Sequence, residues 1–510
     1  KFNSIGVRQW GTYYGGAGDD IGFGISADTA GNILCAGYTK STANIATAGG
    51  YQTIIGGMQD AFIVKFNPSG VRLWGTYYGG GGTEYAMDLV TDITGNTLVT
   101  GLTQSTSNIA TTGAYQVTIA GVQDAFIVKF NPSGVIQWGT YYGGTDYDAG
   151  YGICNDDLGN IILTGSTNST SNIASLGAYQ STLSGGDDAF IVKFNSMGVR
   201  QWGTYYGGAG DENGEKISTD VSGNIVLVGN TYGSTSINLA TIGSHQTTLG
   251  GGVDAFIVKF NSMGALQWGT YYGGGGDDKG YDIVTDTLGN VMVTGKTTST
   301  TNIATPGAYQ TVIGAFNSFY GDGFIVVFDS LGSRKWGTYY GGIYDEVLSS
   351  IAIDLLGNVL VAGGTTSPSG ISTPGAHQPN FGGGGGLDAN ACIAKLKPTY
   401  ILGAPYVCLG DSTQLNTNAL SGGVWITSNP AIASISNSGT VTGITSGNCI
   451  ISYVVLSDTI FIFFTVNPLP NLITNASPNI ICLGSSSTLN VSGANSYIWM
   501  PGNFTGFPIV

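Results

Sequence analysis

The hydrophobic positions of this sequence alternate with small or polar residues over short stretches and nowhere recur with a helical period. One such stretch runs from Ile21 to Ala27 and the next from Ile33 to Tyr38, with the turn Asp28 to Asn32 between them. Alternation with a period of two, bounded by turn residues, is typical of half-buried strands. These two stretches therefore predict an antiparallel hairpin.

The turn of this hairpin, D-x-x-G-N, recurs along the chain. Its glycine can adopt a left-handed backbone conformation that other residues resist. Its aspartate can accept hydrogen bonds from the amides of its own turn. The aspartates of the further copies are Asp92, Asp156, Asp220, Asp286 and Asp354.

Two more strands are predicted in each unit. A Ser/Thr-rich loop of about twenty residues follows the hairpin, then D-A-F-I-V-K-F (Asp60 to Phe66), a turn N-P-S-G, and Val71 to Tyr78. The last strand carries W-G-T-Y-Y-G-G, whose tryptophan recurs at positions 10, 74, 138, 202, 268 and 336. Four antiparallel strands per unit at this period are typical of propeller blades. We therefore expect an all-β fold, with a six-bladed β-propeller of ~64-residue repeats over residues 1–398.

The two ends of the repeat region predict how the ring closes. Asn390 to Pro398 aligns with a third strand but no W-G-T-Y-Y-G-G strand follows it, whereas Val7 to Gly15 is such a strand without a hairpin before it. We expect the N-terminal strand to close the last blade and to hide both sheet edges. Lys1-Phe2-Asn3 duplicates the end of a third strand, which leaves open an upstream seventh blade.

After Pro398 the repeats stop and a β-rich tail begins. Cys408, Trp425 and Cys449 follow one another as in an Ig-like sandwich, where the tryptophan packs on an inter-sheet disulfide. Cys482 and Trp499 repeat the interval of 17 residues. We expect an Ig-like domain at 399–467 with a Cys408–Cys449 disulfide, and the start of a second, incomplete one at 468–510. The chain is expected to continue beyond both ends.

Composition narrows the classes of partner. Only 9% of the residues are charged, and 16 basic against 31 acidic side chains give a net charge of −15. Such a chain lacks the basic footprint that nucleic acids and anionic membranes require. No apolar stretch approaches the ~20 residues that span a bilayer. We expect no nucleic-acid partner, no membrane insertion and no cofactor, unless calcium is bound.

The motifs D-A-F-I-V-K-F-N-P-S-G, W-G-T-Y-Y-G-G, D-x-x-G-N, G-x-T and G-A-Y-Q recur in one order, and together they resemble the SBBP β-propeller repeat family over residues 1–398. In the tail, V-T-G-I-T-S-G (Val441 to Gly447) is similar to bacterial Ig-like modules of group 2, and C-L-G with S-Y-I-W to the PKD-like modules of Bacteroidota surface proteins. The resemblance implies a large secreted or cell-surface protein, often exported by type IX secretion and sometimes associated with adhesion or gliding motility.

Each unit carries acidic residues just after Y-Y-G-G, which would form a ring. Calcium prefers several carboxylate and carbonyl oxygens, so this ring is a candidate calcium site, although no compact D-x-D-x-D-G loop occurs. The alternative is that these carboxylates cap turns on a solvated face. The candidate calcium ligands are Asp19, Asp20, Asp146, Asp148, Asp211, Asp277 and Asp278.

Other chemistry has less support in the sequence. His245 and His377 are the two histidines, and both replace the tyrosine of G-A-Y-Q, which indicates repeat variants rather than general bases. The W-G-T-Y-Y stripe fits packing between blades or, alternatively, sugar stacking. The polar S-T-x-N-I-A-T loops are better candidates for contacts with a partner.

The favoured hypothesis is a non-enzymatic extracellular or cell-surface module, with the propeller as a rigid binding or assembly head and the Ig-like domains as a stalk. Its partners would be a surface protein, a glycan, or further copies of itself in a filament. One alternative is a multivalent glycan-binding lectin with equivalent pockets between blades. The other is a polysaccharide hydrolase or lyase with Asp146 and Asp148 as acid and base.

Overall fold

The computed structural model describes residues 1–233, 239–315, 319–383, 389–419, 421–456 and 458–493, together with 498–499 and 504–505. All regular elements in these ranges are β-strands, which confirms the expected all-β fold. None of the described segments forms an apolar helix of the length needed to cross a membrane. The chain divides into two compact units, Lys1–Pro398 and Thr399–Val510.

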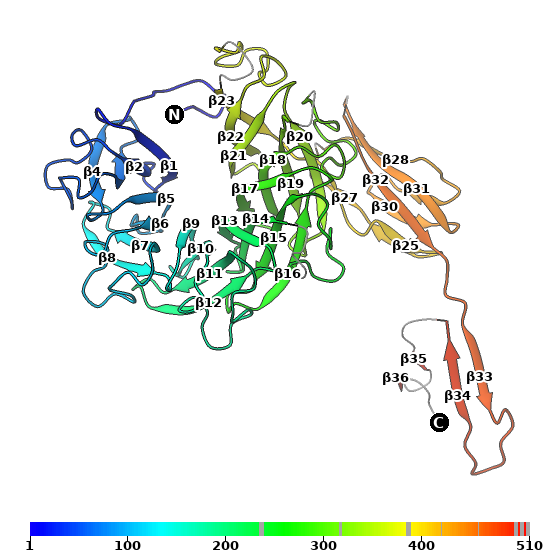
Figure 1. The fold of residues 1–510 in the computed structure, drawn as a ribbon. Coiled ribbons are helices and arrows are strands. Elements are labelled where there is room, and N and C mark those ends of the chain that lie inside the picture. The colour runs from blue at the N-terminus through cyan, green and yellow to red at the C-terminus, as the bar shows by residue number, and fades with distance from the viewer. Residues whose placement is uncertain are drawn as a thin grey trace. The chain divides into compact units, whose positions relative to one another are not determined.

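The first unit consists of repeated antiparallel sheets. Five of them have four strands, which follow one another in chain order, and a sixth sheet has three. Figure 1 shows these sheets succeeding one another around an arc, the arrangement of propeller blades. The strands, blade by blade, are β1 (Asp20–Ala27), β2 (Ile33–Thr39), β3 (Asp60–Phe66) and β4 (Arg72–Tyr78); β5 (Glu84–Thr91), β6 (Thr97–Thr103), β7 (Asp124–Phe130) and β8 (Ile136–Tyr142); β9 (Asp148–Asn155), β10 (Ile161–Thr167), β11 (Asp188–Phe194) and β12 (Arg200–Tyr206); β13 (Asp211–Thr219), β14 (Ile225–Tyr232), β15 (Val253–Phe260) and β16 (Leu266–Tyr272); β17 (Asp278–Thr285), β18 (Val291–Thr297), β19 (Asp322–Phe328) and β20 (Arg334–Tyr340); β21 (Glu346–Ile353), β22 (Val359–Thr365) and β23 (Asn390–Leu396).

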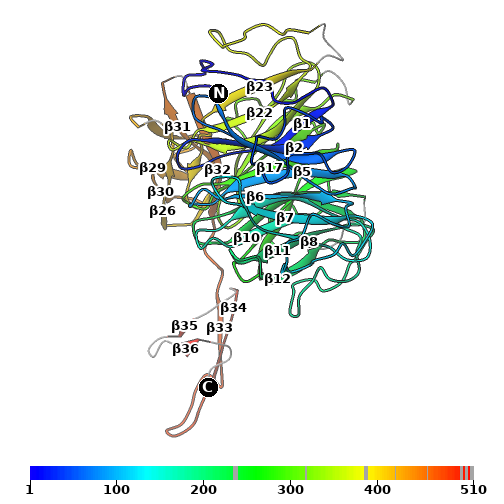
Figure 2. The same cartoon turned by 90° about the vertical axis from the view of Figure 1, so that its left-hand side faces the viewer.

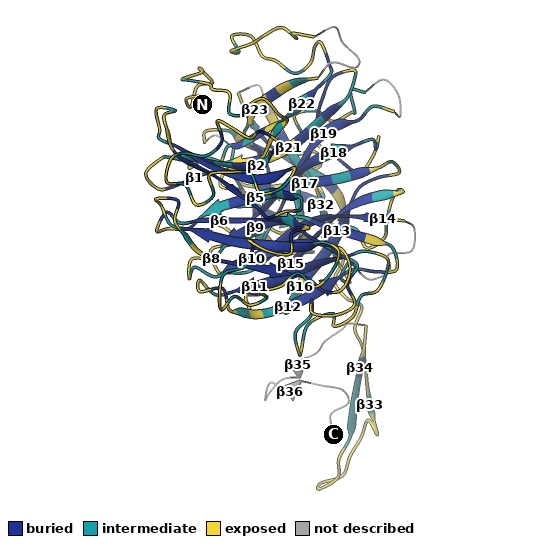
Figure 3. Ribbon diagram, turned by 60° about the vertical axis from the view of Figure 1, so that its left-hand side comes forward, coloured by how far each residue is buried: buried dark blue, intermediate teal, exposed yellow. Residues whose placement is uncertain are grey.

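The third strand of a blade lies at the centre of the hydrophobic core. All seven residues of β3, β7 and β11 are buried. A neighbouring blade covers each face of the sheet for β7 and β11, whereas one side of β3 packs against Tyr14 of the N-terminal segment. One such core joins Ile63 of the first blade to Val99 and Val128 of the second. These central strands are the dark interior of Figure 3. A continuous apolar run such as A-F-I-V is what a strand buried on both faces requires.

A glycine in the second strand permits a β-bulge in the first. In the second blade the register shifts between Ala86 and Asp88, which pair with Gly101 and Thr100. A Cβ at Gly101 would overlap the carbonyl oxygen of Tyr85. This is the situation in which a bulge needs glycine, because the backbone of the partner strand comes too close for a side chain. Equivalent glycines under the same constraint are Gly37, Gly165, Gly229, Gly295 and Gly363.

The expected closure of the sixth blade by the N-terminal strand is wrong for this structure. Among the described residues β23 pairs only with β22. The N-terminal segment folds back on itself, since the amide of Asn3 donates to the carbonyl of Val7 at 3.0 Å and Phe2 forms a bridge with Arg8. The first two residues thereby occupy the place beside residues 8–10 that β23 would need.

The second unit begins with two sheets that share one core. Trp425, Val441 and Phe464 are buried in it, and the rings of Trp425 and Tyr453 lie 5.0 Å apart. One sheet has the order β25-β32-β31-β28 and the other β26-β30-β29. A separate hairpin, β33–β34, follows. The strands are β24 (Ile401–Leu402), β25 (Tyr406–Cys408), β26 (Ser412–Gln414), β27 (Asn416–Thr417), β28 (Val424–Thr427), β29 (Ala433–Ile435), β30 (Thr440–Gly443), β31 (Gly447–Val455), β32 (Asp458–Asn467), β33 (Ile473–Ser477), β34 (Thr488–Ser492), β35 (Ile498–Trp499) and β36 (Phe504–Thr505).

The expected disulfide does not form. Cys408 and Cys449 are both free thiols. They lie in the same sheet on opposite sides of β32, where Cys408 is level with Asn467 and Cys449 pairs with Phe464. Two strand spacings of about 4.8 Å separate them, more than the ~7 Å limit between the Cα atoms of a disulfide. The Ig-like assignment of both tail segments stays a prediction.

Candidate functional site

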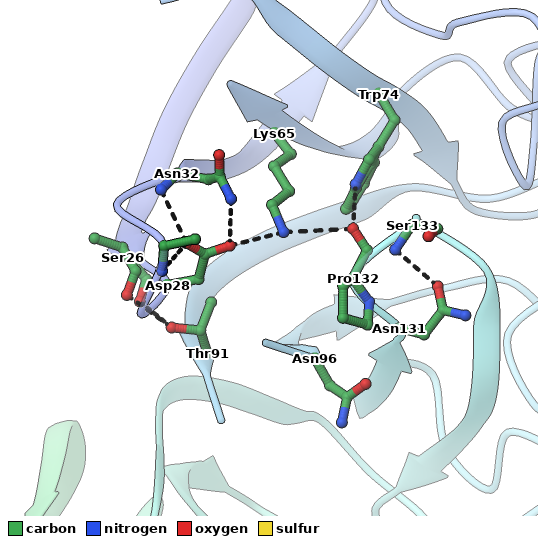
Figure 4. Close-up of polar contacts among 12 residues, drawn as sticks. Ser26, Asp28, Asn32, Lys65, Trp74, Thr91, Asn96, Asn131, Pro132 and Ser133 are labelled. Atoms are coloured by element: carbon green, nitrogen blue, oxygen red, sulfur yellow. Dashed lines mark hydrogen bonds and ion pairs between the residues drawn. The ribbon is translucent and has the colours of Figure 1, made fainter. Parts of the chain in front are cut away.

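At three junctions between blades, two donors of one blade share one acceptor of the next. Figure 4 shows Lys65 Nζ and Trp74 Nε1 of the first blade donating to the carbonyl of Pro132 in the second, at 3.4 and 3.1 Å. The indole lies against Gly134, where a Cβ would come within 2.8 Å of the ring. One face of the tryptophan is therefore used in packing between blades.

The two tyrosines of W-G-T-Y-Y-G-G are structural as well. Tyr77 donates its hydroxyl to the carbonyl of Ser41 in its own blade at 2.8 Å, and Tyr78 to the carbonyl of Ile109 in the next blade at 2.6 Å. Both rings are buried. A buried ring has no face to offer a sugar, so the packing interpretation is confirmed for these tyrosines.

The aspartate of the D-x-x-G-N turn is paired with a lysine of the third strand. Asp28 accepts hydrogen bonds from the amides of Ala30 and Asn32, as predicted, and forms a buried ion pair with Lys65 at 2.8 Å. Burial alone would raise the pKa of Asp28, but the hydrogen bonds from Lys65 and Asn32 outweigh it and lower the pKa to about 2. The pair recurs as Lys129–Asp92, Lys193–Asp156, Lys259–Asp220 and Lys395–Asp354.

One acid of each blade, four residues after the second glycine of Y-Y-G-G, is buried in most blades and accepts several hydrogen bonds. Asp148 accepts from the amide of Gly144 at 2.7 Å, from Ser169 Oγ at 2.8 Å, and from the hydroxyl of Thr167. Asp20 and Asp278 have the same type of partners. Each of these carboxylates ties the start of its own strand to the loop after the second strand.

A second set of buried acids was not singled out from the sequence. Asp60, the first residue of D-A-F-I-V-K-F, accepts from Gln52 Nε2 at 2.7 Å and from the amides of Gly56 and Gly57. It lies beside Glu84 of the next blade, since a Cβ at Gly79 would clash with both carboxyl groups. The same aspartate in other blades is Asp124, Asp188, Asp254 and Asp322. This aspartate recurs in the sequence directly before A-F or G-F, and that recurrence could have identified it as a structural residue.

The structure thus gives the predicted calcium ligands separate roles. Asp19, Asp146, Asp211 and Asp277 are exposed, whereas Asp20, Asp148 and Asp278 face N–H and O–H donors. The hydrogens of these donors occupy oxygens that a cation would need, although Asp278 Oδ1 has no hydrogen-bond partner. Within the described ranges no group of three or more His, Cys, Asp or Glu side chains is placed to hold a metal ion. Calcium at the ring stays a prediction that this geometry does not favour.

The acid pair proposed for glycoside cleavage is divided between two environments. Asp146 is exposed, whereas Asp148 is buried and holds Gly144, Thr167 and Ser169. Glycoside hydrolysis needs two carboxyl groups that both reach the scissile bond. The structure therefore does not bring this pair together as a catalytic site.

The two histidines take the place of the tyrosine, as the repeat pattern predicts. His245 lies 6.2 Å from Tyr272 and 5.8 Å from Phe328, and Tyr115 makes the same contacts with Tyr142 and Phe194 at 6.3 and 5.6 Å. Burial and the charge of Arg334 lower the pKa of His245 to about 4. A neutral, packed imidazole is a scaffold residue.

The buried acids predict that the propeller is more stable at pH 5 than at pH 7.5. Burial raises the pKa to about 6 for four of them, Asp148, Asp188, Asp278 and Asp322. A carboxyl group whose pKa is higher in the folded than in the unfolded state favours folding as it is protonated. Between pH 7.5 and 5 each contributes on the order of 1 kcal/mol. Thermal unfolding followed by circular dichroism at both pH values tests this.

His245 opposes this gain and provides the control. Its folded pKa of about 4 lies below its ordinary value, so the folded state loses stability as the pH falls below about 6.5. His245→Tyr restores the residue of the other repeats and removes this loss. The variant should show a larger increase in melting temperature between pH 7.5 and 5 than the unchanged protein. A melting temperature that falls in both proteins over this range would contradict the assignment.

Two grooves of the same construction lie at the rim, at the second and fourth junctions between the complete blades. One, of ≈ 590 Å³, is lined by Thr112, Tyr115, Gln137 and Trp138 of the second blade and by Met197 of the third. The other, of ≈ 640 Å³, has Ile242, Gln267 and Trp268 of the fourth blade and Leu331 of the fifth at the corresponding positions.

The grooves have many polar groups in their lining, and the charges of the lysines that reach them are neutralised by ion pairs. Lys129 and Lys259 reach them, and each is paired with the aspartate of its own blade. What remains is an indole edge, an exposed glutamine amide, threonine hydroxyls and turn backbone, together with apolar side chains such as Met197 in one groove and Ile242 and Leu331 in the other. A pocket of several hundred Å³ with aromatic groups and a few placed hydrogen-bonding groups is typical of a small-ligand site.

These repeats have known relatives. Residues 9–45 and 267–303 match the SBBP beta-propeller repeat family. Both matched segments run from a W-G-T-Y-Y-G-G strand through the following hairpin to the loop that contributes to the rim grooves. The sequence expectation of this repeat type is confirmed there.

More distant similarity covers larger parts of the propeller chain. An uncharacterized WD repeat-containing protein, L264, of Acanthamoeba polyphaga mimivirus is 22% identical over an alignment of 436 residues, which covers 70% of this chain. The match spans 31% of that protein, about a third of its length.

Three solved structures show a low similarity to this chain. Sqt1 from Chaetomium thermophilum is 11% identical over 88% of this chain and 97% of its own, with a TM-score of 0.34. The gluconolactonase XC5397 of Xanthomonas campestris is 10% identical, with 69% and 84% covered and a TM-score of 0.32. The extracellular domain of BT4673 from B. thetaiotaomicron is 10% identical, with 90% and 57% covered and a TM-score of 0.28. Scores this low assign no function.

Proposed function

We propose that this chain is a non-enzymatic binding module of an extracellular or cell-surface protein, which uses grooves between its blades to hold a repetitive glycan. The observation that carries this proposal is the pair of equivalently lined rim grooves, one between the second and third blades and one between the fourth and fifth. Repeated sites on one rigid scaffold suit a ligand that is itself repetitive, because the second contact is then intramolecular.

The chemistry of the lining favours a neutral, hydroxyl-rich ligand. Gln137 and Gln267 are exposed, and their side-chain amides can both donate and accept. The edges of Trp138 and Trp268 add apolar area beside them. The acids that could catalyse cleavage of such a ligand are engaged in the scaffold at Asp148 and its equivalents.

Extracellular placement and the stalk are further parts of the proposal. The resemblance of the tail to Bacteroidota surface modules supports a stalk of Ig-like domains, export by type IX secretion, and a role in adhesion, gliding or filament assembly. A charged fraction of only 9% with a net charge of −15 suits a protein that meets neutral polysaccharide rather than nucleic acid.

Filling the grooves should abolish binding in steps. Thr112→Trp places an indole in one groove and Ile242→Trp places one in the other, and both positions are exposed, so the fold should not change. On a surface coated with a neutral polysaccharide, each single variant should lose about tenfold in apparent affinity, and the double variant a further factor of about ten or more. Biolayer interferometry against a polysaccharide panel measures this.

Met58→Trp is the matched control, since Met58 is exposed on a loop of the first blade and lines neither groove. It should bind as the unchanged protein does. If the panel shows no binding, or if the double variant binds as well as the control, the grooves do not hold a glycan. A protein ligand of the same surface would then be the hypothesis to test.

A further inference from the structure

Every blade has a β-bulge in its first strand, and the bulged residue changes from blade to blade. These first strands lie on the inner side of the arc in Figure 1. In the second blade Met87 is the extra residue, because Ala86 pairs with Gly101 and Asp88 with Thr100. The bulged residues, one in each blade, are Phe23, Met87, Tyr151, Glu215, Tyr281 and Ser349. The glycine that permits the bulge recurs in all six blades, so the scaffold needs the bulge but no particular side chain in it.

The bulge directs this side chain to the inner edge of its blade. In the third blade a Cβ at Gly150 would collide with Thr100 of the preceding blade. A Cβ at Gly152 would collide with the backbone of Lys216 in the following blade. Tyr151 stands between these two glycines, and it is partly exposed although both glycines are buried. Bulges commonly re-aim a side chain next to a functional site, and here they present one variable side chain per blade towards the axis of the arc.

The inner strands of neighbouring blades contact one another, so the bulged side chains form a continuous row. In the side view of Figure 2 the first three blades follow one another from top to bottom. An ion pair fixes part of this row, since Lys216 Nζ of the fourth blade lies 2.6 Å from Oδ1 of Asp88 in the second. Oδ2 of Asp88 accepts a hydrogen bond from the amide of Ile153 in the third blade at 2.9 Å. Two side chains that directly follow bulged residues thus hold three blades together and preorganise the side chains beside them.

Glu215 is an acid that the repeat does not supply. The recurring acids belong to the D-x-x-G-N turn, to the segment after Y-Y-G-G and to the position before A-F or G-F. Oε1 of Glu215 accepts a hydrogen bond from Nδ2 of Asn230 at 3.1 Å. Asn230 is 1% exposed and bonds to the amide and the carbonyl of Gly280 in the fifth blade, at 2.8 and 3.2 Å. A buried amide that is anchored to the next blade therefore holds this carboxylate in place.

Tyrosines and one lysine surround the carboxylate of Glu215. Burial, and after it the charge of Glu215, raises the pKa of Tyr281 to about 12. The same charge contributes, after burial, to the raised pKa of Tyr151 and of Tyr232. Lys279 Nζ lies 5.5 Å from the centre of the Tyr232 ring, which is a cation–π contact. The third, fourth and fifth blades thus bring aromatic rings, a carboxylate and an ammonium group to one place.

The two opposite charges at this place do not form an ion pair. Burial raises the pKa of Glu215, and the hydrogen bond from Asn230 and the charge of Lys279 oppose this rise. Among the described residues, no carboxylate lies within 4.0 Å of Lys279 Nζ and no cationic nitrogen lies within that distance of Glu215. Charges that are partly withdrawn from water and left without a counter-ion in contact are unfavourable. A ligand that carries both opposite charges would pair with each of them.

We propose that the inner strands of the third, fourth and fifth blades form a binding site for a zwitterionic small molecule, an α-amino acid with an aromatic or large apolar side chain. Glu215 accepts hydrogen bonds from its ammonium group, and Lys279 donates to its carboxylate. The rings of Tyr151, Tyr232 and Tyr281 contact its side chain. This inference does not rest on the proposed glycan binding, because none of these residues lines a rim groove.

The first experiment screens the full chain against the standard L-amino acids at millimolar concentration. We expect phenylalanine, tyrosine, tryptophan or leucine to raise the melting temperature most. Isothermal titration calorimetry then compares the amino acid with the largest effect with its decarboxylated and deaminated analogues, which for L-phenylalanine are 2-phenylethylamine and 3-phenylpropionate. Each analogue lacks one charge and should bind at least tenfold more weakly. A screen in which no amino acid raises the melting temperature, or in which only amino acids with charged side chains do, overturns the proposal.

Two variants separate the roles of the charges. Glu215→Gln should weaken binding of the amino acid at least tenfold and leave binding of the deaminated analogue unchanged, because that analogue has no ammonium group. Lys279→Met should weaken the amino acid to the same extent and leave the decarboxylated analogue unchanged. Asp157→Asn and Lys397→Met are the matched controls, since both residues are exposed and lie outside the inner strands. Both controls should bind all three compounds as the unchanged protein does.

The pattern across the three compounds distinguishes recognition from loss of the fold. A variant that weakens all three compounds equally, or an amino acid that binds both variants as well as the controls, contradicts the assignment of Glu215 and Lys279. The groove variant Thr112→Trp/Ile242→Trp should bind the amino acid normally. Failure of the glycan proposal therefore leaves this one standing, and the reverse also holds.

Discussion

Gly101→Ala is expected to destabilise the propeller by at least about 4 kcal/mol. The new methyl group would overlap the carbonyl oxygen of Tyr85, which belongs to the backbone of the partner strand and cannot rotate away. The bulge between Ala86 and Asp88 would have to be rebuilt, in a blade whose two faces are both packed. Effects this large are exceptional for one methyl group and indicate a backbone clash.

Differential scanning calorimetry of the full chain measures this change. Gly81→Ala is the matched control in the connection that leads into this blade, since a Cβ at Gly81 meets no atom within 4 Å and its backbone is not left-handed. It should shift the free energy of unfolding by less than about 0.5 kcal/mol. Equal effects of the two changes would mean that the close approach of the strands at Gly101 is relieved without cost.

Lys65→Met is expected to lower the free energy of unfolding by about 3 kcal/mol. The change leaves the carboxylate of Asp28 buried without its cation and removes one of the two bonds to the carbonyl of Pro132. Breaking one side of a buried ion pair costs more than removing both sides, because the remaining charge is left without compensation. The double variant Lys65→Met/Asp28→Asn should therefore be more stable than Lys65→Met alone.

The pH dependence identifies the cause of this loss. Asp28 has a folded pKa of about 2, below its ordinary value, so its ionised form contributes stability above about pH 4 that is lost as the pH falls through 2. The difference in free energy of unfolding between the unchanged protein and Lys65→Met should become smaller as the pH falls through this range. Urea denaturation curves at several pH values measure it. A penalty that stays constant from pH 6 to pH 2 would assign the loss to packing of the lysine stem instead.

The repeat itself made much of the fold predictable. A turn such as Asp28 to Asn32 is specified by its own residues, so the local sequence predicts it. Strand β3 begins and ends at the predicted residues, Asp60 and Phe66. The packing role of His245 followed in the same way, because the tyrosine of the other repeats supplied its environment in advance.

Features that depend on distant segments were not predictable. The order of cysteines and tryptophan in the tail does not specify which strand lies between Cys408 and Cys449, and β32 does. Asp60 gains its role from Glu84, which belongs to the next blade, and from a glutamine in a loop. The rim grooves likewise combine the residues of two blades, so only the assembled structure defines them.

The junctions described above are interchangeable, and this bears on how such a gene can change length. The lysine and tryptophan of one blade meet a carbonyl in the next that belongs to proline in Pro132 and to serine in Ser262 and Ser330, so the bond depends on the backbone alone. Unequal recombination that adds or deletes one whole repeat would preserve this contact at the remaining boundaries that have it, although the fifth blade carries Val327 in place of the lysine. Gains and losses of repeats can then accumulate by drift without a compensating second mutation.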